Sequence, residues 1–326
     1  MIRETINSDY RSTDGNTQVS YKIYIPTDNP RAVIQICHGM WEHIGVYERN
    51  GLIKALTDAG IVVCGNDHIG HGSTASSDAM LGHFDNCKHM VDDINELNVI
   101  VRKRYPYLPY ILLGHGFGSF IVRDYITRYS NIDGAVIVGS TSADKPLGTL
   151  KVLSSLTALF RGKRYRTQLV KKLAVGALNT GFASEKDEYS FRNSNPDERT
   201  KIRYDGNQVF DYTVSAYKAV VSLADSVCSS EWAAKVPLSL PIYLMSGKND
   251  PVGECGESVK QLFTILEDVE LNELKMDLFD GRHDIFSDVG RNDAIKSLVD
   301  WTETVCEGVV ACRSFNSIPF GKVEFK

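Results

Sequence analysis

The sequence lacks several features that would place it in a special class of protein. No run approaches the roughly 18 apolar residues of a membrane-spanning helix. The polar N-terminal stretch, MIRETINSDYRSTDGN, has no apolar core of signal-peptide length. The net charge at pH 7 is −5, so no basic excess points to a nucleic-acid partner. We therefore expect an ordinary globular protein of the cytoplasm that does not bind nucleic acid.

Cysteine pairs with metal or redox spacing are also missing. The seven cysteines are scattered, with no CxxC pair, which predicts reduced and mostly buried thiols. The zinc-binding pattern H-E-x-x-H is absent, although His38, Glu42 and His43 lie close together in the sequence. We interpret these three residues as hydrogen-bonded struts near backbone turns, and we expect neither a metal nor a cofactor.

Buried strands and helices alternate along most of the chain of 326 residues. Two strands at 2–8 and 18–25 predict an antiparallel hairpin at a sheet edge. Near-continuous apolar strands follow at 32–37, 61–64, 110–113, 134–139, 241–246 and 273–279. Helical patterns stand between or after them at 47–59, 86–105, 119–129, 256–267 and 285–306. This order predicts an α/β fold with a mostly parallel, doubly wound sheet.

The alternation stops in the middle of the chain. Helical patterns at 147–160, 166–178 and 210–224 are separated by polar loops such as 192–199, with no convincing strand. We predict a core formed by 1–140 and 237–312, a helical lid inserted at 141–236, and a C-terminal tail at 313–326 without an assigned role.

The stretch YILLGHGFGSF, from Tyr110 to Phe120, carries the first candidate for chemistry. An apolar strand that ends in closely spaced glycines and continues as a helix is typical of a nucleophile elbow, G-x-S-x-G. Gly116 occupies the central position. The flanking glycines are needed because the turn brings the helix and strand backbones close together. The sequence therefore predicts the strand-to-helix turn that would carry a nucleophile, but residue 116 has no hydroxyl group.

Two further residues follow later strands in the order of a nucleophile–acid–base triad. Asp250 lies in GKNDP, where its carboxylate can accept the imidazole Nδ1–H, and His283 lies in DGRHD. Asp250 could instead belong to a simple turn before Pro251, and His283 could be a loop histidine without a role. The joint order and spacing argue against both alternatives.

The turn His38-Gly39-Met40 fits an oxyanion hole because it follows a buried strand. We expect the backbone N–H groups of Met40 and Phe117 to converge on one oxygen.

Other polar residues near these motifs have simpler interpretations. Asp67, followed by His68 and His71, is explained by tight turns in which the carboxylate caps local N–H groups. His115 is interpreted as a packing residue. Ser119 would lie one turn into the helix and face away from His283, so we do not assign it as a displaced nucleophile.

Five motifs in this order resemble the monoacylglycerol lipase and lysophospholipase branch of the α/β-hydrolases, also called serine aminopeptidase-like. They are HGMWEH with IGVYERN following, NDHIGHG, LLGHGFGSF, GKNDP and GRHDIF, and the resemblance covers roughly residues 10–306. It implies hydrolysis of a lipid-like acyl ester, with Gly116 at the nucleophile position, Asp250 as acid and His283 as base. It also implies Met40 and Phe117 as oxyanion donors.

The family that the sequence resembles has serine where this sequence has Gly116, and this difference implies a nearly inactive esterase. Loss of a triad nucleophile costs about a million-fold in kcat in a serine protease. Water attack assisted by His283 would retain roughly a thousand-fold over solution. Because Asp250, His283 and HGMWEH are all intact, we hypothesise an engineered Ser→Gly substitution that silences turnover. A natural, non-catalytic binding protein on the same scaffold is the alternative.

The lid is more apolar than a solvated cap needs. The residues concerned are Leu147, Leu150, Leu153, Leu156, Leu159, Phe160, Leu169, Leu173, Val175 and Leu178. They either pack on the core or form a tunnel or membrane-facing surface for a lipid-like substrate, with transient contact to a membrane. A peptidase would need carboxylates for a substrate amine, and Glu185, Asp187 and Glu188 could supply them, although a solvated loop explains them equally well.

Overall fold

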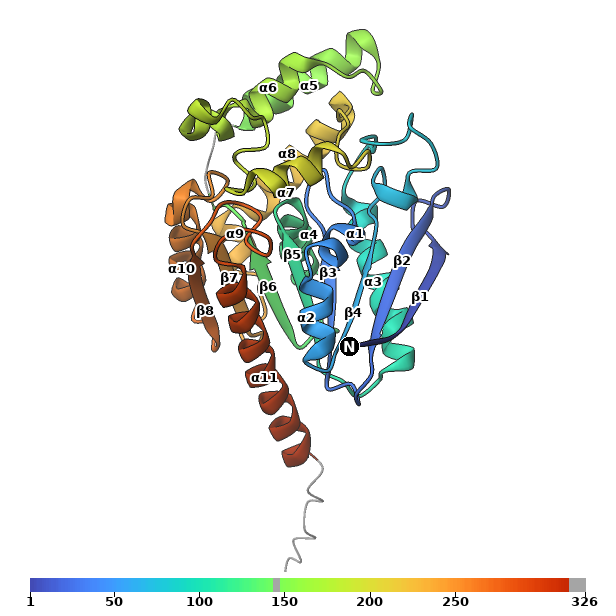
Figure 1. Cartoon of the computed structure of the whole chain (residues 1–326), viewed down its shortest axis with the longest axis vertical. Helices are drawn as coiled ribbons and strands as arrows, with labels where there is room; N and C mark the ends of the chain where they lie inside the picture. The colour runs from blue at the N-terminus through green and yellow to red at the C-terminus, as the bar shows by residue number, and fades with distance from the viewer. Residues whose placement is uncertain (143–146, 317–326) are drawn as a thin grey trace, which may run out of the picture.

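The computed structural model describes residues 1–142 and 147–316, and its centre is a twisted sheet (Figure 1). In the described residues the sheet has eight strands in the order β1-β2-β4-β3-β5-β6-β7-β8. The strands are β1 (Ile2–Arg11), β2 (Gln18–Pro26), β3 (Ala32–Cys37), β4 (Ile61–Asn66), β5 (Tyr110–His115), β6 (Gly134–Val138), β7 (Ile242–Gly247) and β8 (Leu274–Phe279). From β4 to β8 every neighbouring pair is parallel, whereas β1–β2 and β2–β4 are antiparallel. The predicted α/β fold with a mostly parallel sheet is confirmed.

Helices cover both faces of this sheet. They are α1 (Ile44–Arg49), α2 (Leu52–Asp58), α3 (Lys88–Arg104), α4 (Phe117–Tyr125), α10 (Glu257–Asp268) and α11 (Arg291–Asn316). One hydrophobic cluster joins α3, α4 and α10 to the sheet, for example through Ile94, Ile121 and Leu262. A second cluster joins α2 and α11 to the other face through residues such as Leu56 and Leu298. The core strands are therefore buried on both sides, which explains their continuous apolar runs.

Two predicted helices differ from the structure. The single helix expected at 47–59 is two helices, because Gly51 adopts a left-handed φ of +84° between them. The last helix begins at Arg291 instead of 285 and extends to Asn316, beyond the end expected at 306.

Between β6 and β7 the chain forms helices, and we call residues 141–236 the insert. Its described elements are α5 (Leu147–Arg161), α6 (Gln168–Val175), the 3₁₀ segment η2 (Gly176–Glu185), α7 (Pro196–Arg203), α8 (Val214–Val227) and α9 (Ser230–Ala233). Helix α8 packs against both α4 and α5, whereas α5 and α6 lie at the outer end of the molecule (Figure 1). No helix in the described part of the chain has the length and apolar character to span a membrane.

Helix α7 begins inside the segment 192–199, which was predicted to be a polar loop, and continues to Arg203. The Asn195 side chain accepts a hydrogen bond from the Asp197 amide, and Pro196 occupies the first turn. These are standard signals for a helix start. The helix was missed because its sequence has almost no apolar residues.

Candidate active site

The three residues predicted as a triad lie together at the carboxyl edge of the sheet. Gly116 lies between β5 and α4, Asp250 follows β7, and His283 follows β8. The buried Asp250 carboxylate is 2.9 Å, through Oδ2, from Nδ1 of His283. A Cβ atom at position 116 would lie only 2.8 Å from Nε2 of His283. The imidazole is therefore aligned by the carboxylate and aimed at the predicted nucleophile position.

The elbow between β5 and α4 needs glycine for two different reasons. Gly116 has φ +52° and ψ −115°, a conformation that L residues rarely adopt. At Gly118 a Cβ atom would lie 2.0 Å from the carbonyl oxygen of Cys37, at the end of β3. The second glycine thus permits close contact between α4 and β3, which brings the elbow next to the loop after β3.

That loop leaves one amide unused between two that are engaged. The Gly39 amide donates to Oε2 of Glu42 over 2.7 Å, and the Trp41 amide donates to the Tyr212 hydroxyl over 2.9 Å. For the Met40 amide between them, no acceptor is present among the described residues. The Phe117 amide lies in the first turn of α4, where N–H groups have no partner within the helix. Both predicted oxyanion donors are therefore free to bind a ligand oxygen.

A buried network of charges lies behind the histidine. The Glu42 carboxylate accepts hydrogen bonds from Tyr47 Oη at 2.6 Å and from Arg192 Nη2 at 2.8 Å, and it lies 3.1 Å from Nδ1 of His115. Arg192 also contacts Asp284, with 3.1 Å between Nε and Oδ2. All five side chains are largely or completely buried, so these charges depend on one another for stabilisation.

The network changes the protonation of its members. Burial alone would lower the pKa of His115, but the Glu42 carboxylate outweighs it and raises the pKa to about 9. Burial alone would raise the pKa of Glu42. The His115 and Arg192 cations outweigh this effect and hold the pKa of Glu42 well below its usual range. Burial raises the pKa of Asp284 despite the neighbouring Arg192. His115 is therefore a buried cation as well as a packing residue.

Among the residues that the structure describes, one cluster has ligand atoms close enough together to hold a metal ion, and it consists of His115, His283 and Asp284. Nδ1 of His115 faces Glu42, and its Nε2 lies 3.1 Å from the carbonyl oxygen of His283. Both partners can only accept, so both ring nitrogens of His115 carry protons. Since Nδ1 of His283 is also engaged, with Asp250, these groups form a hydrogen-bond network, and we assign no metal site to them.

The other polar residues near the motifs have structural contacts. Asp67 accepts hydrogen bonds from the amides of Ile44 at 2.8 Å and Ser73 at 2.7 Å, so the predicted capping role is confirmed. The Ser119 hydroxyl bonds to the Gly116 carbonyl oxygen at 2.5 Å and does not contact His283. This agrees with our interpretation that Ser119 is not a displaced nucleophile.

The insert is bonded directly to the loop that carries the histidine. The amide of His283 is 3.4 Å from the Phe191 carbonyl oxygen, and the Asp284 amide donates to the Arg192 carbonyl oxygen over 2.8 Å. Arg282 also forms an ion pair with Glu185 of the insert. These contacts join segments about 90 residues apart and had no signal in the sequence.

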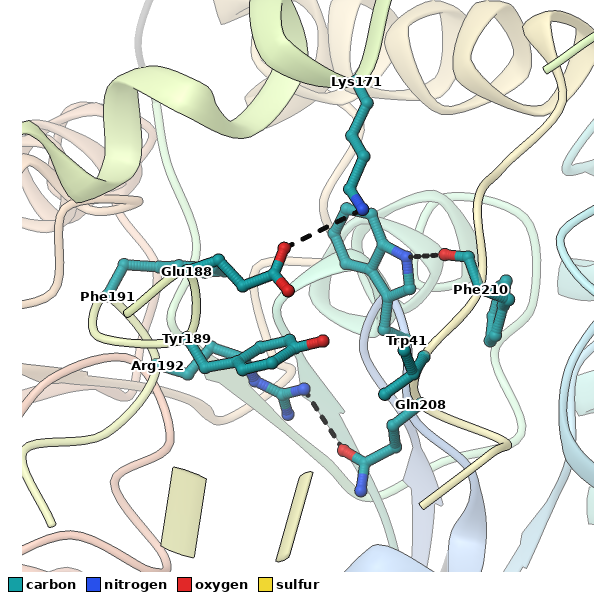
Figure 2. Close-up of a pocket in the computed structure, with 9 residues that line it drawn as sticks. Trp41, Lys171, Glu188, Tyr189, Phe191, Arg192, Gln208 and Phe210 are labelled. Atoms are coloured by element: carbon teal, nitrogen blue, oxygen red, sulfur yellow. Dashed lines mark hydrogen bonds and ion pairs between the residues drawn. The ribbon is translucent and has the colours of Figure 1, made fainter. Parts of the chain in front are cut away.

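A pocket lies beside the loop after β3 (Figure 2). Four of its nine lining residues are aromatic, and Lys171 and Glu188 form an ion pair across it with 3.9 Å between Nζ and Oε2. The other lining residues are Trp41, Tyr189, Phe191, Arg192, Gln208, Val209 and Phe210. The pocket is therefore formed by the insert together with Trp41 of the loop after β3, and charged side chains line it beside the aromatic ones.

Comparison with known proteins identifies relatives that match part of this chain. A monoacylglycerol lipase of Mycolicibacterium smegmatis is 30% identical over 139 residues, which are 43% of this chain and 48% of that protein. A monoglyceride lipase of Homo sapiens is 29% identical over 176 residues, which are 52% of this chain and 54% of that protein. The matches thus span about half the length of these curated relatives.

Solved structures extend the similarity to nearly the whole fold. A thermostable carboxyl esterase from Bacillus coagulans, in complex with glycerol, has a TM-score of 0.86 and 26% identity, over 93% of this chain and 99% of that one. A soluble variant of monoglyceride lipase from Saccharomyces cerevisiae shares the fold at a TM-score of 0.73 and 17% identity, over 94% and 96%. The family model described as serine aminopeptidase, S33, matches residues 28–289. The chain therefore belongs to the serine aminopeptidase S33 family of α/β-hydrolases.

Proposed function

We propose that the chain is a serine hydrolase scaffold for carboxylic esters with lipid-like acyl groups, such as a monoacylglycerol or a lysophospholipid, in which glycine occupies the nucleophile position. The observation that carries this proposal is the Asp250–His283 pair aimed at residue 116. The lipase and esterase relatives support the substrate class.

With serine at position 116, the geometry would support acyl transfer through a covalent intermediate. His283 would remove the hydroxyl proton through Nε2, while Asp250 holds its Nδ1–H and its orientation. The oxyanion that forms would accept hydrogen bonds from the Met40 and Phe117 amides. His283 would then protonate the leaving alcohol, and water activated by the same residue would release the acid.

As the chain stands, Gly116 has no oxygen to form the acyl intermediate, and we propose that it is close to inactive. The intact triad partners, oxyanion loop and charge network support a substitution introduced into an active parent. The second candidate is a natural binding protein, which the close approach of His283 favours. A Cβ atom at position 116 would lie only 2.8 Å from Nε2 of His283, so the site fits glycine more closely than a larger residue.

The outer helices of the insert support transient contact with a membrane surface. Leu159 and Phe160 on α5 are 77% and 79% exposed, and Leu169 and Leu173 on α6 are also exposed. Packing on the core cannot explain these side chains, because they point into solvent. Exposed apolar groups on adjacent helices are typical of surfaces that enter a lipid interface. In the Gly116→Ser variant, we expect Leu159→Ser with Phe160→Ser to weaken binding to phospholipid vesicles without changing hydrolysis of a short, water-soluble ester.

The peptidase alternative loses support from the charges of the insert. Glu185 pairs with Arg282 and Arg199, and Asp187 pairs with Arg199 and Arg203. Glu188 faces Lys171. Each of these three carboxylates therefore already faces a cation of the protein, and we rank an aminopeptidase below an esterase.

The test compares this chain with its Gly116→Ser variant on p-nitrophenyl esters from acetate to decanoate. If only the variant hydrolyses them and reacts with a fluorophosphonate probe, the proposal holds, and the chain-length profile measures the acyl pocket. If neither protein reacts while both are folded, the proposal fails. Ligand binding without turnover, together with glycine at codon 116 in the source genome, would then identify a natural binding protein.

A further inference from the structure

Tyr212, in the insert just before α8, makes two short contacts that the proposed mechanism does not use. The side chain is 1% exposed, and its hydroxyl oxygen lies 2.9 Å from the backbone nitrogen of Trp41 and 2.6 Å from Nε2 of His71. One hydroxyl from the insert thus bridges the loop after β3 and the loop after β4, on the side of the predicted oxyanion hole.

The direction of both hydrogen bonds follows from the surroundings of His71. Its Nδ1 lies 3.0 Å from the Ile69 carbonyl oxygen, which can only accept, so Nδ1 carries the proton. Nε2 is then an acceptor, and Tyr212 donates to it. Burial lowers the pKa of His71 to about 3, so this arrangement persists at neutral pH. The Tyr212 oxygen is left to accept the Trp41 N–H.

This bond determines which amide of the loop remains available. The Gly39 and Trp41 amides are engaged on either side of Met40, and Trp41 has φ +54°, which is uncommon for a residue other than glycine. The acceptor supplied by Tyr212 stabilises Trp41 in that conformation. Met40 therefore presents its N–H between two fixed neighbours.

The insert also holds the Trp41 side chain. The indole Nε1 donates to the carbonyl oxygen of Phe210 over 2.9 Å (Figure 2). The segment that supplies both contacts is itself anchored, because the Thr213 amide donates to the Gly82 carbonyl oxygen over 2.9 Å. We propose that Tyr212 is a positioning residue for the oxyanion hole, which makes the geometry of that hole depend on the insert. This inference rests on the proposed function of the Met40 amide.

The first test uses the chain as it exists and needs no activity. Labelling tryptophan with ¹⁵N gives backbone signals for the three tryptophans of the sequence. In Tyr212→Phe we expect hydrogen exchange at the Trp41 amide to become at least about tenfold faster, since the amide loses its acceptor. The Trp232 amide, which bonds to Ser229, is the internal reference.

Tyr217→Phe is the matched control. Tyr217 is also buried, its ring centre is 5.7 Å from that of Tyr212, and its hydroxyl has no hydrogen-bond partner among the described residues. Removing that hydroxyl should leave Trp41 exchange unchanged. Unchanged exchange in Tyr212→Phe, or an equal increase in both variants, would overturn the proposal.

The second test adds each substitution to the Gly116→Ser variant. Loss of a direct oxyanion donor costs about 10²–10³ in kcat, and a displaced donor should cost about 10–100-fold. We expect Tyr212→Phe to lower kcat by this factor with KM within twofold, and Tyr217→Phe to change neither. Equal kcat values for the two variants would refute the positioning role. If the Gly116→Ser parent is inactive, the proposed function fails, while the exchange test still decides whether Tyr212 holds the loop.

Discussion

The substitution Gly116→Ser should return activity at a measurable cost in stability. The new residue must keep φ +52° and ψ −115°, a conformation that costs about 1–3 kcal/mol for residues other than glycine. In addition, its Cβ would lie 2.8 Å from Nε2 of His283, so the imidazole must move back by a few tenths of an ångström.

Two effects offset part of this cost. A residue other than glycine restricts the unfolded chain, which stabilises the native state by about 0.4–1 kcal/mol. A hydrogen bond between the serine hydroxyl and His283 contributes about 0.5–1.5 kcal/mol more. Gly116→Ala has the first effect without the second. We therefore expect Gly116→Ala to lose about 1–2 kcal/mol in free energy of unfolding, and Gly116→Ser to fall between it and the glycine protein.

Urea denaturation and ester hydrolysis of the same three proteins check this ordering. Activity should rise by about a million-fold with serine and stay at the glycine level with alanine. The strain argument would be refuted if alanine were as stable as glycine at this position. A folded but inactive Gly116→Ser protein would refute the assignment of the nucleophile position instead.

Three further predictions follow from the same geometry. In the serine background, Asp250→Asn should lower kcat by about 10⁴ without unfolding the protein, because an amide orients the wrong tautomer of the histidine; a kcat equal to that of the Gly116→Ser parent would contradict this. The pKa of His115 is raised to about 9 from an ordinary value of about 6.5, so its contribution to stability is complete below pH 6.5 and is lost as pH rises to 9. Between pH 6 and pH 9, denaturation should show that this group's contribution to the free energy of unfolding falls by about 3 kcal/mol, and the His115→Gln protein should not show this loss. If the free energy of unfolding of the two proteins had the same pH dependence, the buried cation would be excluded. Gly118→Ala should lose more than about 3 kcal/mol or fail to fold, because its Cβ would lie 2.0 Å from a backbone oxygen. Gly206→Ala, with no atom within 4 Å of its Cβ, is the control and should have normal stability.

The sequence was sufficient for the sheet and for the residues at its carboxyl edge. Strands buried on both faces leave continuous apolar runs, and loops that follow parallel strands meet at one edge. The convergence of Gly116, Asp250 and His283 could therefore be predicted from their positions after strands. Helix α7 was also predictable, since Asn195 and Pro196 mark its start, although it has almost no apolar residues.

The surroundings of the site could not be predicted in the same way. Arg192 reaches Glu42 across 150 positions of sequence, and Tyr212 reaches Trp41 across 171. Neither contact produces a periodic or local pattern, because each depends on how the insert lies on the core. His115 illustrates the result: its neighbours in the sequence suggest packing, and only the folded chain places a carboxylate beside it.

The bonds between the insert and the histidine loop limit how this fold can diversify. Inserts between core strands are attractive units for exchange among relatives, because they can change the substrate without disturbing the catalytic edge. Here Phe191 and Arg192 bond to the backbone of His283 and Asp284, so a transplanted insert would bring a different support for the base. Chimaeras of this family should therefore exchange the insert and the loop around His283 as one unit, and recombination that separates the two should yield folded proteins with a poorly oriented histidine.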